Sequence, residues 1–191
     1  MKKALIALAI VGLLVLIIGG SALGIYNSLQ LMDESVNSSW AQVENQIQRR
    51  GDLIPNLVNT VKGYAKHESS IFTDIANARA KLAGAVQKSD IKGVNQANME
   101  FAGALSRLLA IAENYPDLKA NQNFIALQDE IAGTENRLAV ARRDYNEAVK
   151  QLNGKIRTFP TNIIAGMAGI KAREYFEVEE AKKEVPQVDF N

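Results

Sequence analysis

The residues that could carry out chemistry in this chain are few. The 191 residues include no cysteine and a single histidine, His67. Disulfides, thiolate zinc sites and cysteine nucleophiles are therefore excluded, and one histidine cannot form a histidine metal cluster. The sequence also lacks a glycine-rich phosphate loop, a His-Glu-x-x-His motif and calcium-loop spacing. We expect no catalytic residues, no metal site, no cofactor and no enzymatic activity, with His67 an exposed polar residue.

Charged side chains at otherwise apolar positions are more informative. Between residues 36 and 85, two series of residues spaced seven apart are apolar except for Arg50 and Glu68. Further along, Glu135 and Arg142 are seven apart beside an apolar stripe. Buried charges persist only when they are paired and hydrogen-bonded. We therefore expect a buried polar network between helices, with Arg79 as a further candidate, made of Arg50, Glu68, Arg79, Glu135 and Arg142. The alternatives are that the charged heads reach solvent while their stems pack, or that they line a binding cleft.

The N-terminal segment must place these residues relative to a membrane. Lys2 and Lys3 precede an uncharged run of 23 residues, from Ala4 to Tyr26. A hydrocarbon core needs roughly 20 such residues, so we expect residues 1–26 to form an uncleaved anchor, with a cleaved signal peptide as the alternative. No Lys or Arg follows the run until Arg49. The positive-inside rule then predicts a single-pass protein with a cytoplasmic N-terminus and a periplasmic or extracytoplasmic C-terminal domain.

Two glycines in the predicted span could bring helices together. Gly20 and Gly24 form a small-xxx-small pattern, which allows close packing of membrane helices. Glycine is also common in membrane helices without such a role. We retain self-association through this patch as one hypothesis.

Helical periodicity continues through the remaining chain, and strand-like alternation is absent. A heptad-like, coiled-coil pattern predicts one helix from Val36 to Ala85, and Ser89 or Asp90 could cap a second helix that ends near Pro116. A third pattern runs over residues 122–157, and Pro160 ends it. The short apolar segment 161–170 is expected to cap the bundle, although it could instead lie on a membrane or dock a partner.

These elements predict an all-α fold: an N-terminal transmembrane helix followed by an elongated antiparallel bundle. The bundle would contain three long helices plus a short C-terminal helix over residues 27–170, because long apolar faces must be buried against one another. Residues 171–191 are expected to form an irregular, charged C-terminal tail.

The segment RRGDLIPNLV, residues 49–58, contains an Arg-Gly-Asp tripeptide and an internal proline. An adhesion tripeptide must be displayed on an exposed turn, whereas Arg50 lies on the apolar series that faces the core. The seven-residue spacing also continues across the proline. We therefore expect a continuous helix kinked at Gly51 and Pro55, with Gly51 yielding to the proline ring four residues on. In the alternative, Asp52 would cap a restarted helix.

Three long motifs resemble the LemA family of bacterial membrane proteins. They read WAQVENQIQRRGDLIPNLVNTVKGYAKHE, YPDLKANQNFIALQDEIAGTENRLAVARRDYNEAV and FPTNIIA, the last followed by YFE. The resemblance implies one N-terminal span and a helical bundle, and it implies no established enzymatic activity or cofactor. It also implies that the family signature includes Arg50, Leu53, Ile54, Pro55, Asn56, Glu68, Thr134, Glu135, Arg142, Tyr145 and Asn146. Gly51 departs from the family, which often carries a bulkier polar residue there.

Together these patterns predict a membrane-anchored scaffold or interaction protein of the bacterial envelope that self-assembles and has no catalytic activity. The expected partners are membrane lipid, further copies of the chain and other envelope proteins. With 22 basic and 21 acidic residues and no basic stripe, nucleic acid is not an expected partner. The alternative function is an envelope sensory or binding module that takes a peptide or small ligand in a polar cleft between helices.

Overall fold

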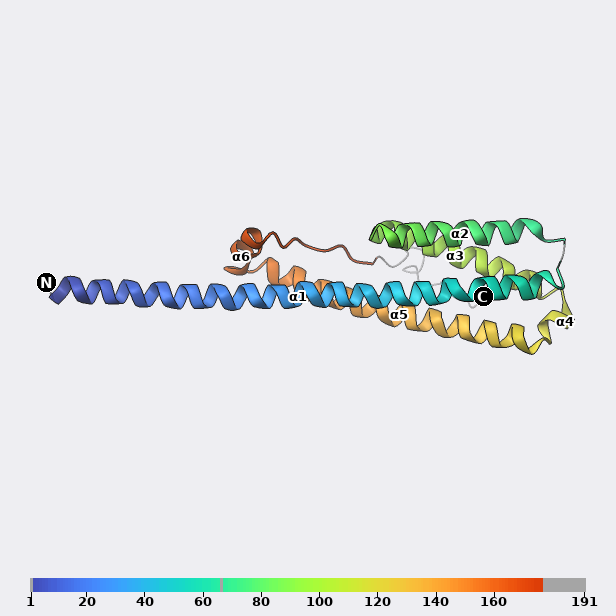
Figure 1. Cartoon of the computed structure of the whole chain (residues 1–191), viewed down its shortest axis with the longest axis horizontal. Helices are drawn as coiled ribbons and strands as arrows, with labels where there is room; N and C mark the ends of the chain where they lie inside the picture. The colour runs from blue at the N-terminus through green and yellow to red at the C-terminus, as the bar shows by residue number, and fades with distance from the viewer. Residues whose placement is uncertain (1, 66, 177–191) are drawn as a thin grey trace, which may run out of the picture. The chain divides into compact units, whose positions relative to one another are not determined.

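The computed structural model describes residues 2–65 and 67–176, and these residues form helices without any β-strand. The predicted all-α class is thus confirmed for the described residues. In chain order the helices are α1 (Lys2–Lys62), α2 (Ser69–Gln87), α3 (Ile91–Ala112), α4 (Pro116–Lys119), α5 (Gln122–Ile156) and α6 (Thr161–Ala168), as labelled in Figure 1. Residues 171–176 have no regular structure, and the rest of the expected tail, 177–191, lies outside the described residues.

The chain divides into two compact units. Unit 1 comprises Met1–Ala41 and Asp144–Glu174, and unit 2 comprises Gln42–Arg143 and Tyr175–Asn191. Helices α1 and α5 each contribute to both units. The expected limits of the membrane anchor, residues 1–26, stay a prediction.

Unit 2 contains four long helical segments, from α1, α2, α3 and α5, and the short helix α4. Ion pairs join Lys81 to Glu100 at 2.6 Å and Asp74 to Arg107 at 3.5 Å, so α2 and α3 run antiparallel. Apolar side chains from all four segments are buried, each contributing about 1.5–3 kcal/mol. The largest contributors include Ile54, Leu57, Ile75, Leu82, Phe101, Leu108, Phe124 and Leu138.

The prediction of one helix from Val36 to Ala85 is wrong. Helix α1 ends at Lys62, and α2 begins at Ser69. The seven-residue spacing persisted because both helices turn their apolar residues toward the same core, so the pattern continues although the backbone reverses. Glu68, the charged residue in its series, lies at the N-cap position of α2.

Helix α1 continues through Gly51 and Pro55, as expected, and the restarted helix is not observed. A Cβ added at Gly51 would approach Arg79 Nε at 3.6 Å, an ordinary contact distance. A side chain that begins with a Cβ can therefore start at this position without displacing a neighbour. Arg50 is only 4% exposed, so the tripeptide is not displayed for adhesion. The kink itself stays a prediction.

The other predicted helix ends agree closely with the structure. The carboxylate of Asp90 accepts a hydrogen bond from the Gly93 N–H at 3.0 Å and caps α3. The predicted third helix, residues 122–157, corresponds to α5, and α6 is the expected short apolar helix. At the start of α5, the Asn121 side chain accepts from the backbone N–H groups of Asn123 and Phe124.

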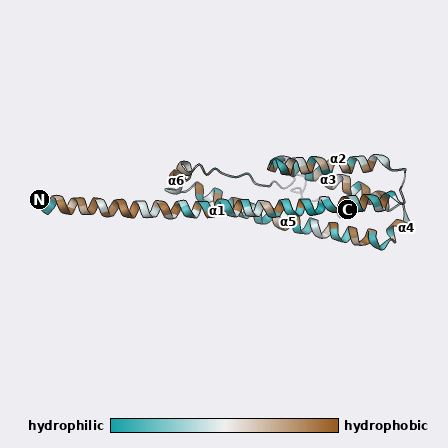
Figure 2. Ribbon diagram, in the orientation of Figure 1, coloured by the Kyte–Doolittle hydropathy of each residue, from teal (hydrophilic) through white to brown (hydrophobic). Residues whose placement is uncertain are grey.

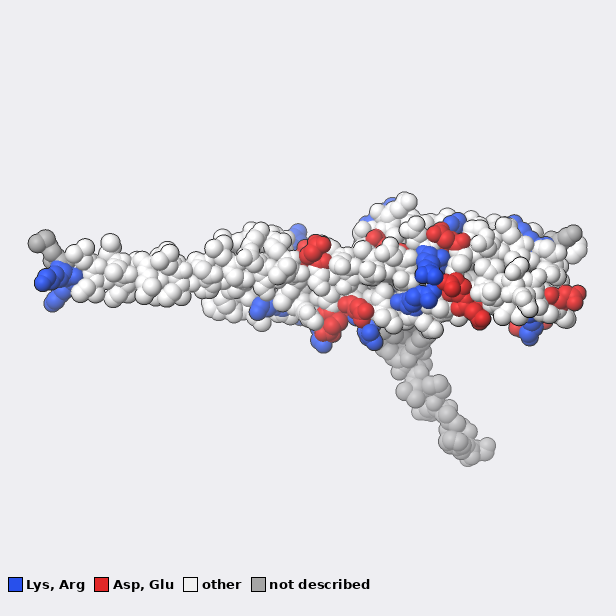
Figure 3. Space-filling model, turned by 60° about the horizontal axis from the view of Figure 1, so that its bottom comes forward, with Lys and Arg blue, Asp and Glu red and all other residues white. Residues whose placement is uncertain are grey.

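Unit 1 begins with an apolar part of α1 that no other described residue covers. Residues 2–21 are all exposed, although this part of α1 is strongly hydrophobic (Figure 2). Among the described residues, α1 is the one helix long and apolar enough to cross a membrane. Figure 3 shows basic side chains at its start, where the sequence has Lys2 and Lys3, followed by a stretch that shows no charged side chain. The first fully buried residue along α1 is Leu29.

Candidate functional site

A cluster of charged side chains lies beside the core of unit 2, where Arg50 is buried and Glu135 and Arg142 are half-buried. Arg50, on α1, forms an ion pair with the Glu135 carboxylate of α5 and donates a hydrogen bond to Asn98 Oδ1 at 3.5 Å. Its guanidinium carbon lies 5.1 Å from the centroid of the Phe101 ring. Helices α1, α3 and α5 thus place an ion pair, an amide and an aromatic face around one arginine.

Arg142 adds a second positive charge to this cluster. Its guanidinium carbon lies 5.4 Å from the centroid of the Phe176 ring, and its charge interacts with Glu135 and with Arg50. Arg142 Nε and Nη2, and Arg50 Nε, are buried without a hydrogen-bond partner in the described part of the chain. One carboxylate therefore balances two guanidinium groups. We call Arg50, Glu135 and Arg142 the arginine cluster.

Burial disfavours the charged form of both arginines. It lowers the pKa of Arg50, and the charge and hydrogen bond of Glu135 oppose this effect. Burial also lowers the pKa of Arg142, where Glu135 again opposes it and Arg50 adds to it. Because arginine starts from so high a pKa, both side chains remain charged at neutral pH. The stability of the core therefore depends on the single carboxylate of Glu135.

The structure does not bring the other two expected residues into the cluster. Glu68 lies beyond the end of α1, and the twelve residues from Arg50 to Lys62 correspond to about 18 Å of helix. Arg79, on α2, is partly exposed, and its Nη2 lies 3.6 Å from Asp52 Oδ1. The sequence pattern placed these side chains on core-facing series but did not specify which ones would meet.

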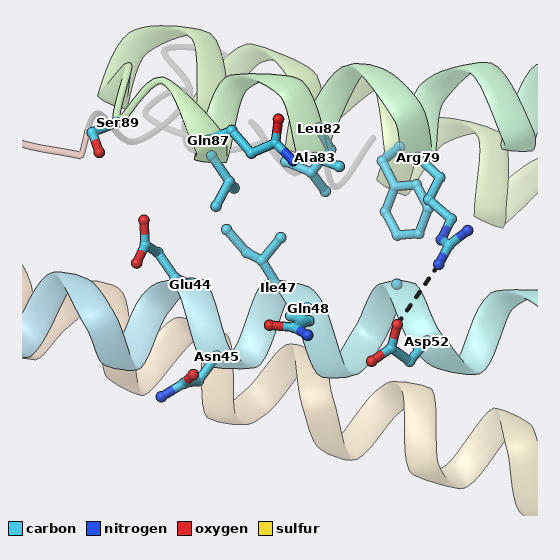
Figure 4. Close-up of a pocket in the computed structure, with 13 residues that line it drawn as sticks. Glu44, Asn45, Ile47, Gln48, Asp52, Arg79, Leu82, Ala83, Gln87 and Ser89 are labelled. Carbon is cyan, nitrogen blue, oxygen red and sulfur yellow. Dashed lines mark ion pairs between the residues drawn. The ribbon is translucent and has the colours of Figure 1, made fainter.

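A groove between α1 and α2, with a volume of about 500 Å³, is the site that the sequence reasoning missed. Figure 4 shows Ile47 of α1 facing Leu82 and Ala83 of α2, with the Asp52–Arg79 pair to one side. Its lining residues recur every four residues on each helix: the polar Glu44, Gln48 and Asp52 on α1, and Arg79, Ala83 and Gln87 on α2. This period of four was the signal that could have identified the groove. Mixed apolar and hydrogen-bonding side chains can bind a peptide or a small polar molecule.

A second set of specific contacts holds the C-terminal strap, residues 171–174, in unit 1. The Asn153 side chain donates to the Arg173 carbonyl and accepts from the Arg173 N–H, both at 2.8 Å. The Tyr145 hydroxyl donates to the Glu174 carbonyl at 2.9 Å, and Arg173 pairs with Asp33 at 2.8 Å. The backbone of the strap is therefore bound by side chains, although it has no regular structure of its own.

We expect Tyr145 to make unit 1 sensitive to alkaline pH. Burial raises the pKa of Tyr145 from 10.0 to about 12. Since the pKa of Tyr145 is higher in the folded than in the unfolded chain, the protonated side chain stabilises the folded state. This stabilisation is fully present below pH 10 and is lost as pH rises through 12. The loss should be on the order of 2 kcal/mol.

The measurement is urea unfolding between pH 8 and about 12, comparing the parent with Tyr145→Phe. Near neutral pH the variant should be less stable by about 1 kcal/mol, because it cannot donate to the Glu174 carbonyl. Above pH 10 the difference in free energy of unfolding between the parent and the variant should narrow, because the parent loses stability as Tyr145 ionises and phenylalanine does not ionise. A gap independent of pH would contradict the expectation.

The remaining predicted residues have simple surroundings. His67 is exposed, in the connection between α1 and α2. Gly20 and Gly24 are exposed in α1, with no other side chain within 4 Å of an added Cβ. Over the residues that the structure describes, no three His, Cys, Asp or Glu side chains are grouped so as to hold a metal ion.

Comparison with known proteins agrees with the three sequence motifs. The family model described as the LemA family matches residues 39–190. Two relatives from Paramagnetospirillum magneticum, Magnetosome protein MamQ 2 and Magnetosome protein MamQ 1, are each 29% identical over 179 residues. Each match covers 82% of this chain and 66% of the relative, so the chain spans slightly less than two thirds of their length. Protein LemA of Metamycoplasma hominis is 25% identical over 158 residues, which cover 82% of this chain and 71% of that protein.

The family match begins at residue 39, within α1, and extends through the arginine cluster and the strap. The resemblance inferred from the motifs is therefore confirmed, and the chain belongs to the LemA family.

Proposed function

We propose that this protein is a membrane-anchored, non-catalytic scaffold of the bacterial envelope that works by associating with further copies of itself and with other envelope proteins. One observation carries the proposal. The apolar beginning of α1 is entirely exposed, whereas the helical segments that follow it bury apolar side chains. So large an exposed apolar surface needs lipid or another apolar surface around it.

The length and charge of this segment support a single transmembrane pass. The 23 residues from Ala4 to Tyr26 extend about 35 Å as a helix, compared with about 30 Å of hydrocarbon. Lys2 and Lys3 would remain in the cytoplasm, and the helical units would lie on the extracytoplasmic side.

The burial of the arginine cluster favours a scaffold over a ligand cleft at that position. The Arg50 side chain is 5% exposed and already paired with Glu135, so a ligand would have to open the core to reach it. The α1–α2 groove supports the second candidate function, binding of a peptide or small ligand, because its polar lining is accessible. Self-assembly remains the favoured function because it also accounts for the exposed glycines.

Replacing Gly20 and Gly24 together with leucine should abolish self-association within the membrane. Leucine side chains would hold the backbones of neighbouring helices apart, whereas the exposed glycines allow close approach. The oligomer size of the detergent-solubilised protein, measured by mass photometry, should fall to that of a monomer.

Gly12→Leu is the matched control, since Gly12 lies in the same apolar segment with equally open surroundings. This variant should retain the oligomer of the parent. If the parent itself were strictly monomeric, the assembly proposal would fail, and ligand binding in the groove would become the favoured function.

A further inference from the structure

We propose that α6 is an interfacial helix that lies on the surface of the membrane beside the end of the transmembrane segment. Its large apolar side chains would enter the lipid, and nearby basic side chains would contact anionic headgroups. This inference rests on the proposed membrane anchoring and adds a second, peripheral contact between unit 1 and the bilayer.

The two faces of α6 have an unusual distribution of side-chain size. Thr161 and Ala165, which are small, are turned inward and are 3% and 1% exposed. Phe159, Ile163 and Met167 are 80%, 53% and 83% exposed. A helix that served only as a cap for the bundle would turn its largest apolar residues inward.

The three large residues are exposed within one short stretch of chain. Ile163 and Met167, four residues apart, lie on one face of α6, and Phe159 is exposed two residues before the helix begins. An exposed apolar stripe on a short helix is typical of helices that lie in the headgroup region of a membrane. We call these three residues the apolar stripe.

The stripe lies where the predicted transmembrane segment ends. Along α1, every residue up to Ser21 is exposed, and the first partly covered residues are Ala22 and Ile25. Figure 1 shows α6 beside this part of α1. The strap that follows α6 is tied to α1 by the Arg173–Asp33 pair, so α6 is held near the end of the exposed apolar segment. A bilayer around Ala4–Tyr26 would therefore have its surface close to α6.

The charges around α6 complement an anionic membrane. From Ala148 to Arg173 the chain carries five basic residues and no acidic residue. Lys155, Arg157 and Lys171, which flank the stripe on both sides, are exposed. Each Lys or Arg near an anionic surface strengthens binding by roughly fivefold. These charges favour lipid over a second copy of the same positively charged surface, which would repel it.

The absence of cysteine from the sequence allows site-specific labelling of the full-length protein. Three single substitutions, Met167→Cys, Leu13→Cys and Ser70→Cys, would each carry a polarity-sensitive fluorophore. The proteins would be reconstituted into phosphatidylcholine vesicles with and without phosphatidylglycerol. Brominated acyl chains would report contact with lipid, and iodide would report contact with water.

We expect brominated lipid to quench the label at Met167, more strongly with phosphatidylglycerol than without it. Leu13, within the span, should be quenched in both lipids, and the exposed Ser70 on α2 should be quenched by iodide alone. Substituting Lys155, Arg157 and Lys171 with glutamine should reduce quenching at Met167 in anionic vesicles to the level seen in neutral ones.

Two results would overturn the inference without affecting the anchor: a Met167 label as accessible to iodide as the Ser70 label, or one shielded from both quenchers. The second result would indicate that another copy of the chain covers the stripe. If the Leu13 label escaped brominated lipid, the proposed anchoring would itself be wrong. Equal quenching at Met167 in neutral and anionic vesicles would disprove the role of the basic residues.

Discussion

Glu135→Ala is expected to lower the free energy of unfolding by about 3 kcal/mol, because it leaves the guanidinium groups of the buried Arg50 and the half-buried Arg142 without their counter-charge. Arg50 is 4% exposed and cannot regain water, and its pKa is already lowered by burial. Alanine is a strong helix former, so the loss should not come from α5 itself. Urea unfolding followed by circular dichroism would measure the change.

Glu130→Ala is the matched control for this experiment. Glu130 lies on the same helix and pairs with Arg49 at 2.7 Å and with Arg137 at 3.1 Å. All three side chains are well exposed, so the loss should stay below about 1 kcal/mol. Equal effects at Glu130 and Glu135 would contradict the importance of the buried pair.

Arg50→Met should cost less than Glu135→Ala, within about 1 kcal/mol of the parent. Methionine fills a similar volume against the Phe101 ring, and it removes the buried charge entirely. The Glu135 side chain, which is 45% exposed, can be hydrated when its partner is lost. Were Arg50→Met the more harmful substitution, the ion pair would be more stabilising than its burial cost suggests.

Asn153→Ala is expected to destabilise unit 1 by about 2–3 kcal/mol and to release the strap. The substitution removes both side-chain hydrogen bonds to the Arg173 backbone and leaves its N–H and carbonyl without those partners. Amide hydrogen exchange at Arg173 and Glu174 should accelerate to the rate of an unprotected segment, while exchange in α2 and α3 should not change.

Gln151→Ala provides the comparison for Asn153→Ala. Gln151 is exposed on the same helix, and its hydrogen bond to Glu147 is long, at 3.4 Å. This variant should keep the parent's stability and the protection of Arg173. If Asn153→Ala left hydrogen exchange in the strap unaltered, the Arg173–Asp33 ion pair would be sufficient to hold it.

Helical periodicity predicted most of the fold because the spacing of apolar residues within each helix indicates which of its faces is buried. The start of α3, the full extent of α5 and the short α6 all followed from local patterns and caps. The turn after Lys62 was not predictable from that period. Two helices that face the same core can continue one heptad series, so spacing alone cannot detect a reversal of the chain.

The candidate site was predictable in part. Charged residues on apolar series indicated that Arg50, Glu135 and Arg142 would be buried or close to the core, and the structure brings these three together. The same reasoning included Glu68 and Arg79, which lie elsewhere. The period specifies the face on which a residue lies, whereas the partner depends on how far along the neighbouring helix it falls.

The sequence by itself determined the helical class, the apolar segment able to span a membrane, and the family. These properties depend on local composition and on spacing along one helix. Only the tertiary structure decided which charges meet, where the α1–α2 groove opens, and that Phe159 and the α6 residues Ile163 and Met167 are exposed. The physical reason is that such contacts join residues far apart in the chain. Asp33 and Arg173, for example, are 140 residues apart in the sequence and form their ion pair only in the folded chain.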